Sequence, residues 1–248
     1  MPELDQVLEL RGVSRRFGGV RAVRKVSFTM DEGQILFIIG PNGAGKTTLF
    51  NLISGFLHPD EGGIFFRGKD ISRIPAHDAA RVGIGRTFQI VKPLANLTVL
   101  ENVMLGAFMH TGHLHAAEQE ADRILDFLQM SHMKKLQARG LPLAALKRLE
   151  IARALATKPK LILLDEVVSG LTTSEALALA ELVKRLPEWG VSVVGGVEHV
   201  MQVVMKIAHR VVVLDFGAKI AEGVPAEVVK NPAVIEAYLG AKYKERTQ

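Results

Sequence analysis

The chain has 248 residues, of which 48% are hydrophobic and 23% charged, and its formal net charge is +5. This length and composition predict a globular protein of one large domain, or of one domain with a smaller lobe, and a buried core. The absence of cysteine excludes disulfides and thiolate metal sites, and no apolar stretch approaches the ~20 residues that a membrane-spanning helix needs. Because the lysines and arginines are scattered, the charge indicates a solvated surface plus a phosphate site rather than a face for nucleic acid or membrane.

The first part of the chain shows the alternating pattern of strands with one buried face. Apolar and polar residues alternate over residues 26–30, with a similar pattern at Leu8, Leu10 and Val13. Residues 64–66 follow an Asp-Glu-Gly-Gly turn and have the composition of another strand. We expect these segments to form an antiparallel layer beside a nucleotide-binding core.

A phosphate-binding loop follows, because residues 40–47 fit the pattern G-x-x-x-x-G-K-[S/T] at every fixed position. Lys46 of such a loop reaches the β- and γ-phosphates, and the Thr47 hydroxyl ligates Mg²⁺. An apolar strand at 34–39 and a helix pattern at 48–53 flank the loop, which directs the positive end of the helix dipole at the phosphates. The sequence therefore predicts a nucleoside triphosphate site formed by Gly40, Pro41, Asn42, Gly43, Ala44, Gly45, Lys46, Thr47 and Thr48.

Helical signals dominate from about residue 93 to residue 156, after a glycine-rich link at 82–89. Thr98 followed by Glu101 is a capping box, which predicts the start of a helix. Apolar residues then recur at helical spacing between 117 and 128. We expect a helical subdomain inserted into the core over about residues 93–156.

The β/α rhythm returns in the last third of the chain. Apolar strand patterns at 161–164, 191–194 and 211–214 alternate with helix patterns at 174–186 and 200–208. Continuous apolar strands alternating with helices predict a parallel sheet that is covered on both faces. The prediction is a single α/β domain over residues 1–248 with the core of a P-loop nucleoside triphosphatase.

Two carboxylates, Asp165 and Glu166, end the apolar strand at 161–164. A parallel strand beside the phosphate loop presents both at its carboxyl end, where ligands bind in open α/β sheets. Asp165 is then placed to hold Mg²⁺, and Glu166 to polarise the attacking water as a general base. A strand that ends in acids at a plain surface is equally common, and the pairing with the phosphate loop is what favours catalysis.

Three further residues are weaker candidates. His199 follows the next apolar strand, from which an imidazole would hydrogen-bond the γ-phosphate and the attacking water, although most single histidines are structural. Gln89 precedes the helical region, where its amide would reach the metal or the water. Phe17 is either an aromatic ring stacked on a base or a core residue. The residues alone leave these alternatives open.

The phosphate loop, Gln89, the pair Asp165 and Glu166, and His199, in this order around a helical insertion, resemble the ATPase subunits of ABC transporters. The resemblance covers essentially the whole chain. Segments that are similar more narrowly to the branched-chain amino acid transport ATPases are 83–89, 97–103, 148–155 and 231–240.

The resemblance implies an ABC ATPase fold and ATP hydrolysis coupled to transmembrane transport, with ATP and Mg²⁺ as cofactors. It implies transmembrane permease subunits and a second ATPase subunit as partners, a solute-binding protein indirectly, and no nucleic acid. It places the chain peripherally on the cytoplasmic face of the inner membrane. Gln89 takes the role of a metal-contacting residue that couples nucleotide to permease, His199 that of the γ-phosphate switch, and Phe17 that of the ring on adenine.

The chain departs from this family where an L-S-G-G-Q stretch is usual, because residues 141–145 read Leu-Pro-Leu-Ala-Ala. In the family this stretch grips the γ-phosphate bound to the opposite subunit. Pro142 has neither a hydroxyl nor an N–H group, and Ala145 lacks the amide side chain, so we expect a weaker grip. If the partner is a different ATPase subunit, the two ATP sites are unequal, with hydrolysis mainly at this chain's phosphate loop.

Other departures lie near the carboxylates. Val167 stands where proline is usual, and Thr172 stands where the family has Asp or Asn; with Glu175 it predicts a capping box. Gly195 and Gly196 replace bulky strand residues, which indicates close packing.

Alternative functions remain within reach of the motifs. An ABC ATPase of another transport system, for lipid or another solute, is the first alternative. ABC ATPases of nucleic-acid repair or translation usually carry two ATPase domains or a long coiled coil, whereas this chain has one phosphate loop and a short helical region. A small-molecule kinase or GTPase leaves Gln89 and His199 unexplained, and the N-K-x-D motif is missing.

Overall fold

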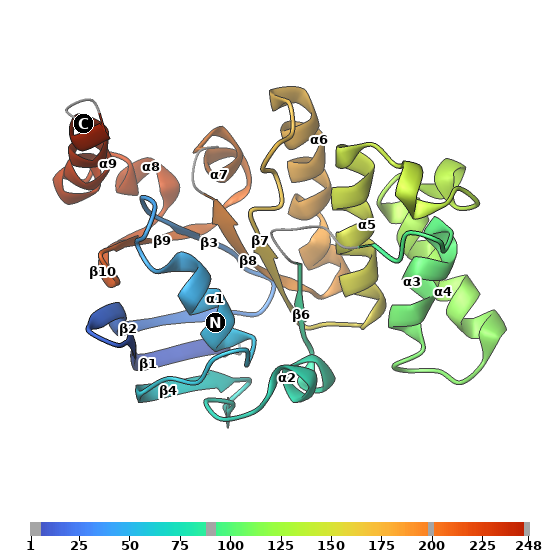
Figure 1. Cartoon of the computed structure of the whole chain (residues 1–248), viewed down its shortest axis with the longest axis horizontal. Coiled ribbons are helices and arrows are strands. Elements are labelled where there is room, and N and C mark those ends of the chain that lie inside the picture. The colour runs from blue at the N-terminus through green and yellow to red at the C-terminus, as the bar shows by residue number, and fades with distance from the viewer. Residues whose placement is uncertain (1–5, 88–92, 198–200, 246–248) are drawn as a thin grey trace, which may run out of the picture.

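The structure is a computed structural model that describes residues 6–87, 93–197 and 201–245 (Figure 1). Within these residues the strands form two sheets. The first is antiparallel, and its strand order is β2 (Val20–Asp31), β1 (Gln6–Phe17), β4 (Glu61–Phe66) and β5 (Lys69–Asp70). The predicted N-terminal antiparallel layer is therefore confirmed.

The second sheet carries the phosphate loop. Its strand order is β10 (Ala218–Gly223), β9 (Arg210–Asp215), β3 (Ile35–Ile39), β8 (Ser192–Val197), β7 (Leu161–Asp165) and β6 (Ile84–Arg86). Strands β9, β3, β8, β7 and β6 run parallel, as predicted, and β10 pairs antiparallel with β9. The sequence prediction missed β10 and β6, and β10 adds an antiparallel edge to the parallel sheet that was predicted.

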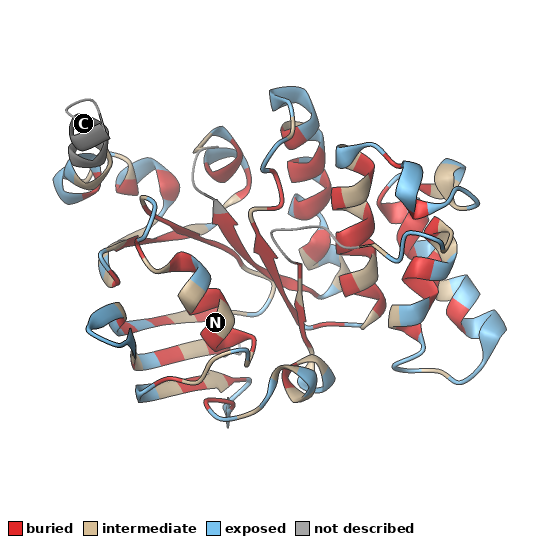
Figure 2. Cartoon of the chain, viewed as in Figure 1, coloured by how far each residue is buried: buried red, intermediate tan, exposed pale blue. Residues whose placement is uncertain are grey.

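Strand β3 connects two hydrophobic cores, because its side chains alternate between the two faces of the sheet and all are buried. Ile35, Phe37 and Ile39 belong to the core shared with the helices, whereas Leu36 and Ile38 face the antiparallel sheet and the first helix. Figure 2 shows β3, β7 and most of β9 as part of a buried layer between the other elements. Each fully buried aliphatic side chain contributes about 1.5–3 kcal/mol, which fixes the strand that precedes the phosphate loop.

The helices account for the rest of the described fold. They are α1 (Lys46–Ile53), α2 (Ala76–Val82), α3 (Val99–Ala107), α4 (Leu114–Phe127), α5 (Leu143–Ala156), α6 (Thr173–Lys184), α7 (Met201–Ile207), α8 (Pro225–Val228) and α9 (Pro232–Glu245), with short 3₁₀ turns η1 (Ser131–Met133), η2 (Ala138–Gly140) and η3 (Leu186–Trp189). Helices α3, α4 and α5 pack together at one end of the molecule, where the sequence predicts the helical subdomain (Figure 1). None of the described helices is both long and apolar enough to cross a membrane.

Helix α6 is shorter than its predicted extent of 174–186. It ends at Lys184, and the chain continues through Leu186 and Pro187 as the 3₁₀ turn η3. Because proline disfavours an α-helical residue before it and offers no N–H donor, the helix ends ahead of Pro187.

The paired glycines of β8 have a steric cause. A Cβ atom on Gly195 would lie 2.5 Å from the ring of Phe37, and one on Gly196 would lie 3.0 Å from the ring of Phe50. The two glycines thus make room on opposite faces of the sheet for aromatic rings from β3 and α1. The close packing expected from the sequence is confirmed.

Both predicted capping boxes are present. At the start of α3 the Glu101 N–H donates to the Thr98 hydroxyl at 3.2 Å, and the Thr98 N–H donates to the Glu101 carboxylate at 2.7 Å. Thr172 and Glu175 form the same reciprocal pair at the start of α6. These bonds satisfy N–H groups that the first helical turn leaves without partners.

Thr98→Ala is expected to destabilise the protein by about 1 kcal/mol, because an N-cap residue typically contributes that much. For a chain of this size this corresponds to a fall in Tm of about 2–4 °C, measured by calorimetry at neutral pH. The Thr98 backbone N–H lowers the pKa of Glu101, so the carboxylate contributes at neutral pH and its contribution is lost as the pH falls through that lowered pKa. Thr98→Ser, which keeps the acceptor, is the control, and an equal loss in both variants contradicts the capping role.

Candidate active site

The phosphate loop connects β3 to α1. Two of its positions require glycine because backbone atoms of other strands lie too close to leave room for a Cβ atom. Gly40 has φ = 155°, and a Cβ atom there would lie 2.1 Å from the Leu214 carbonyl oxygen. Gly45 has φ = 100°, and a Cβ atom there would lie 2.3 Å from the Ala22 carbonyl oxygen. The loop is thus held between β9 and β2, where only glycine fits.

Lys46 lies inside this loop. Its side chain is 7% exposed, and its Nζ donates to the carbonyl oxygens of Gly40 at 2.8 Å and Pro41 at 2.9 Å. Helix α1 begins at Lys46, and its N-cap, Gly45, provides no side-chain acceptor for the first N–H groups. An ammonium group and the amino end of a helix therefore meet at the loop, and both attract phosphate oxygens.

Two cavities meet at Thr47. One, of about 540 Å³, is lined by Gly19, Val20, Arg21, Ala22, Arg24, Gly43, Ala44, Gly45, Lys46, Thr47, Thr48 and Phe216. Phe17 lies next to this cavity at the end of β1, where it is 45% exposed and pairs with Val20 in the hairpin. The guanidinium of Arg15 lies 5.1 Å from the centre of its ring. This exposed position excludes the alternative that Phe17 is a core residue.

The larger cavity, of about 970 Å³, lies between the nucleotide-binding core and the helical region. Its lining includes Thr47 and Asp165, together with residues of α1, α2, β6, α3 and α5. Thr47 is exposed and Asp165 is 5% exposed. A hydroxyl and a carboxylate facing one cavity supply oxygen ligands, which suit Mg²⁺ held by one or two protein groups and substrate phosphates. Among the described residues, no group of three or more His, Cys, Asp and Glu forms an all-protein metal cage.

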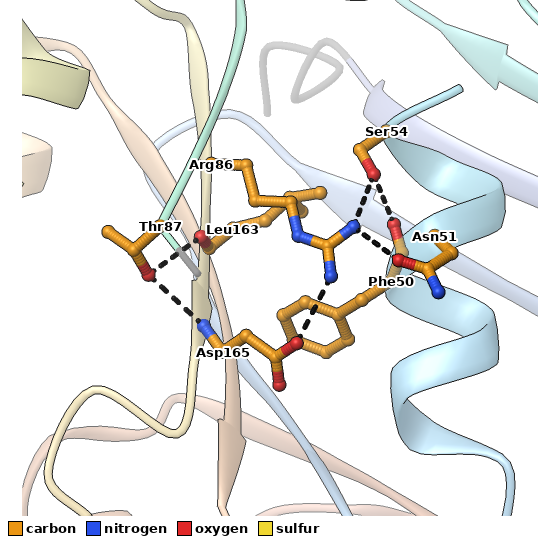
Figure 3. A network of polar contacts seen from close by, with 7 residues as sticks. All are labelled: Phe50, Asn51, Ser54, Arg86, Thr87, Leu163 and Asp165. Carbon is orange, nitrogen blue, oxygen red and sulfur yellow. Dashed lines mark hydrogen bonds and ion pairs between the residues drawn. The ribbon is translucent and has the colours of Figure 1, made fainter. Parts of the chain in front are cut away.

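Asp165 is held by a buried polar network that the sequence did not reveal (Figure 3). Arg86 Nη2 donates to Asp165 Oδ2 at 3.1 Å, and both side chains are less than a tenth exposed. Arg86 Nη1 donates to Asn51 Oδ1 and to Ser54 Oγ, each at 2.7 Å. The guanidinium therefore joins the end of β6 to the last turn of α1 and to the end of β7.

The same junction fixes the backbone of Asp165. Its N–H donates to the Thr87 hydroxyl at 3.3 Å, and that hydroxyl donates to the Leu163 carbonyl at 3.4 Å (Figure 3). The Thr87 N–H donates to the same carbonyl at 2.9 Å. Burial lowers the pKa of Arg86, and the neighbouring Asp165 charge opposes this shift. Arginine nevertheless stays charged in proteins, so the pair is ionic.

Arg86→Lys is expected to destabilise the protein by about 1–3 kcal/mol. One ammonium group cannot donate to Asp165, Asn51 and Ser54 at once, as the planar guanidinium of Arg86 does. The free energy of unfolding, from urea titration, measures the change. Arg81→Lys is the matched control, since Arg81 forms an exposed pair with Asp78 on α2. Equal stability of Arg86→Lys and wild type contradicts a structural role of the Arg86 guanidinium.

Glu166 has an uncommon backbone conformation, with φ = 48° in the left-handed region. Its N–H donates to the Gly196 carbonyl at 3.0 Å, and its own carbonyl accepts from the Ser169 N–H at 3.0 Å and from Lys147 Nζ at 3.3 Å. Holding a residue other than glycine in this region costs on the order of 1–3 kcal/mol, and such residues cluster at functional sites. The backbone of Glu166 is thus fixed by β8, by its own turn and by α5.

Gln89 and His199 lie outside the described residues, so their predicted roles stay predictions. In the sequence, Gln89 comes shortly after β6, which ends at Arg86, and His199 comes shortly after β8, which ends at Val197. In the parallel register Arg86 pairs with Leu163, and Gly196 pairs with Asp165. Strands β6, β7 and β8 therefore end at one edge of the sheet, the edge where ligands bind in such folds.

Segment 141–145, which differs from the usual L-S-G-G-Q stretch, lies at the start of α5. Pro142 is the N-cap residue of this helix, with φ = −65° and ψ = 158°, and no side chain caps the first turn. Leu143 is 42% exposed and Ala145 is 6% exposed. The helix and its dipole persist, as expected for a proline at a helix start, while this end of α5 offers neither a hydroxyl nor a side-chain amide.

Comparisons with known proteins agree with this geometry. A sequence model of the ABC transporter family matches residues 23–169, and a model of the branched-chain amino acid ATP-binding cassette transporters matches residues 218–244. The chain is 38% identical over 252 residues to a probable branched-chain amino acid transport ATP-binding protein, LivG, of Archaeoglobus fulgidus, covering 97% of this chain and 98% of the relative.

Solved structures share the fold. The structure of an ATP-binding cassette of an ABC transporter in its ADP conformation superposes with a TM-score of 0.86 at 33% identity, covering 95% of this chain and 99% of that one. A dimeric ATP-binding cassette in a post-hydrolysis state with ADP and phosphate has a TM-score of 0.78 at 25% identity, covering 88% and 98%.

Proposed function

Because the chain belongs to the ATP-binding subunits of ABC transporters, we propose that it energises the import of branched-chain amino acids. The observation that supports this most is that Thr47 of the phosphate loop and Asp165 line one cavity, in a chain whose relative is named for such transport. The match of residues 218–244 to the branched-chain cassette model adds independent support from the C-terminal region. The fold and family make the chain an ATPase.

Each residue of the site has its own role in the reaction. Lys46 and the N–H groups at the start of α1 bind the β- and γ-phosphates, and the glycines of residues 40–45 let the backbone approach them. Phe17 stacks on the adenine at the rim of the smaller cavity. Glu166 accepts a proton from the attacking water as general base.

Mg²⁺ is the proposed metal, with Thr47 and Asp165 as its protein contacts and Gln89 as a third. Such an ion supplies charge neutralisation at the transferring phosphoryl group. Gln89 also links the nucleotide to the permease, and His199 binds the γ-phosphate. In the sequence, Gln89 follows β6, which ends at Arg86, and His199 follows β8, which ends at Val197.

We further propose that the chain lies on the cytoplasmic face of the inner membrane. There it binds transmembrane permease subunits and a second ATPase subunit, and acts indirectly with a solute-binding protein. The different ATPase partner is favoured by segment 141–145, because two copies of this chain would leave both ATP sites without a hydroxyl or an amide from that segment.

The test is uptake by proteoliposomes that contain the chain with its permease and ATPase partners and the solute-binding protein. Leucine, isoleucine and valine are expected to stimulate ATP hydrolysis and to accumulate inside. Other amino acids, amides and urea serve as competitors. Transport of one of these competitors without transport of leucine, isoleucine or valine contradicts the substrate class, and ATP hydrolysis without transport of any of them contradicts the importer.

A further inference from the structure

We propose that Lys147 of α5 is a positioning residue for Glu166, which it holds through the backbone carbonyl. The inference rests on the proposed function of Glu166 as general base. It adds that α5 is the helix that positions this base. Lys147 comes two residues after the altered segment 141–145, on the same helix, so the segment and the base are linked within one chain.

Lys147 is unusual because its side chain is 3% exposed. A buried ammonium group costs several kcal/mol unless hydrogen bonds compensate it. Its Nζ donates to the Glu166 carbonyl at 3.3 Å, and within the described part of the chain this is its one hydrogen-bond partner. A lysine that served packing alone would extend its ammonium group to solvent. Burial of Lys147 against a single carbonyl therefore indicates that the contact itself is used.

The accepting carbonyl belongs to the residue in the left-handed conformation. That conformation costs on the order of 1–3 kcal/mol, and a hydrogen bond from a charged donor contributes about 1.5–3 kcal/mol. The Lys147 bond is thus large enough to offset the backbone cost at Glu166. Without it the Glu166 carbonyl keeps, among the described residues, only the Ser169 N–H as a donor, so the left-handed backbone of Glu166 is held less firmly and its carboxylate is positioned less precisely.

A second contact ties the same turn to α5. Gly170 has φ = 78°, and a Cβ atom there would lie 3.0 Å from Leu143 Cδ2. The turn 166–170 therefore packs on the first turn of α5 at Leu143 and bonds to its second turn at Lys147. A shift of α5, for instance when its exposed N-terminal end meets another subunit, is transmitted to the catalytic carboxylate through both contacts.

The experiment compares Lys147→Met with Lys147→Arg in the full chain assembled with its transporter partners. Lys147→Met keeps the volume and loses the donor, so we expect kcat for ATP hydrolysis to fall about 10- to 100-fold, the effect of misplacing a catalytic group by about 1 Å. The affinity for a fluorescent ATP analogue is expected to stay within about twofold, because Glu166 acts on the water and not in binding. Lys147→Arg is expected to retain most of kcat.

Lys134→Met is the matched control, since Lys134 lies in the same helical region and bonds Asp122 at 2.9 Å, remote from Glu166; its kcat is expected to equal that of wild type. Leu143→Ala, at an exposed position, removes the second contact and is expected to lower kcat less, in the same direction. In a Glu166→Gln background, Lys147→Met is expected to cause no further loss.

Unchanged kcat in Lys147→Met overturns the proposal. So does a further independent loss in the Glu166→Gln background, or a fall in nucleotide affinity as large as that in kcat. If Lys147→Met fails to fold, the result for Leu143→Ala decides. If Glu166→Gln alone leaves turnover intact, it is the proposed general base that fails.

Discussion

Glu166→Gln is expected to reduce ATP hydrolysis by the assembled transporter by about 10²- to 10⁴-fold, the usual contribution of a positioned general base. The substitution keeps the shape of the side chain and removes its proton acceptor. The backbone contacts of Glu166 with Gly196, Ser169 and Lys147 do not involve the carboxylate, so the fold is expected to be unchanged. Nucleotide affinity is expected to persist, because the phosphate loop is intact.

The same substitution in the partner ATPase is expected to have a smaller effect. In ABC ATPases of this kind each ATP lies between one phosphate loop and the segment that opens the corresponding α5 of the other subunit. This chain's segment has Pro142 as N-cap without a side-chain cap, and its Ala145 is buried and apolar. With the different ATPase subunit proposed as partner, the partner's ATP is expected to lose a hydroxyl and an amide contact, whereas the ATP on this chain is expected to face the partner's segment.

Steady-state phosphate release, with one subunit mutated at a time, measures this asymmetry. Glu181→Gln is the matched control, because Glu181 is an exposed glutamate on α6 paired with Lys206. Full turnover after Glu166→Gln, together with loss of turnover after the partner's substitution, contradicts the assignment of the active site to this chain.

The sequence predicts the elements whose own residues set their structure. Strands β3 and β7 consist of continuous buried apolar residues, and such runs are recognisable without tertiary information. The capping boxes at Thr98 and Thr172 are local, so both starts of helices were correct. The phosphate loop is likewise defined by the spacing of its own glycines and Lys46.

Elements that depend on neighbours were missed. Strand β6 has three residues and is a strand only because β7 pairs with it, and β10 is a half-buried edge strand with no apolar run. Arg86 and Lys147 are single cations in segments of quite different pattern, and nothing in their spacing relates them to residues 165 and 166. Their contacts join residues 79 and 19 positions apart, and such contacts exist only in the folded chain.

Arg86 and Lys147 hold the neighbouring residues Asp165 and Glu166 in different ways. Arg86 binds the Asp165 carboxylate itself, from the end of the edge strand β6. Lys147 binds the Glu166 backbone carbonyl, from the helical region. Asp165, the proposed metal-holding residue, is thus fixed to α1 through Arg86, Asn51 and Ser54, whereas Glu166, the proposed base, is tied to α5.

Lys46→Met is expected to weaken ATP binding by about 100-fold or more, since hydrogen bonds from a charged donor contribute about 1.5–3 kcal/mol each and each 1.4 kcal/mol is a factor of ten. Nζ already lies within 2.9 Å of two loop carbonyls. A triphosphate in the loop offers this buried ammonium stronger, charged acceptors at nearly the same position. Equilibrium titration with a fluorescent ATP analogue measures the change.

The variant must separate phosphate binding from stability of the loop, because the same Nζ bonds the Gly40 and Pro41 carbonyls. Met fills the volume of Lys but leaves both carbonyls without this donor, so Tm without nucleotide is expected to fall, while the rise in Tm on adding ATP is expected to disappear. Lys69→Met, an exposed substitution on β5, is expected to keep that rise. If Lys46→Met retains the wild-type rise in Tm, then the amino end of α1 alone binds the phosphates, and Lys46 serves only to close the loop.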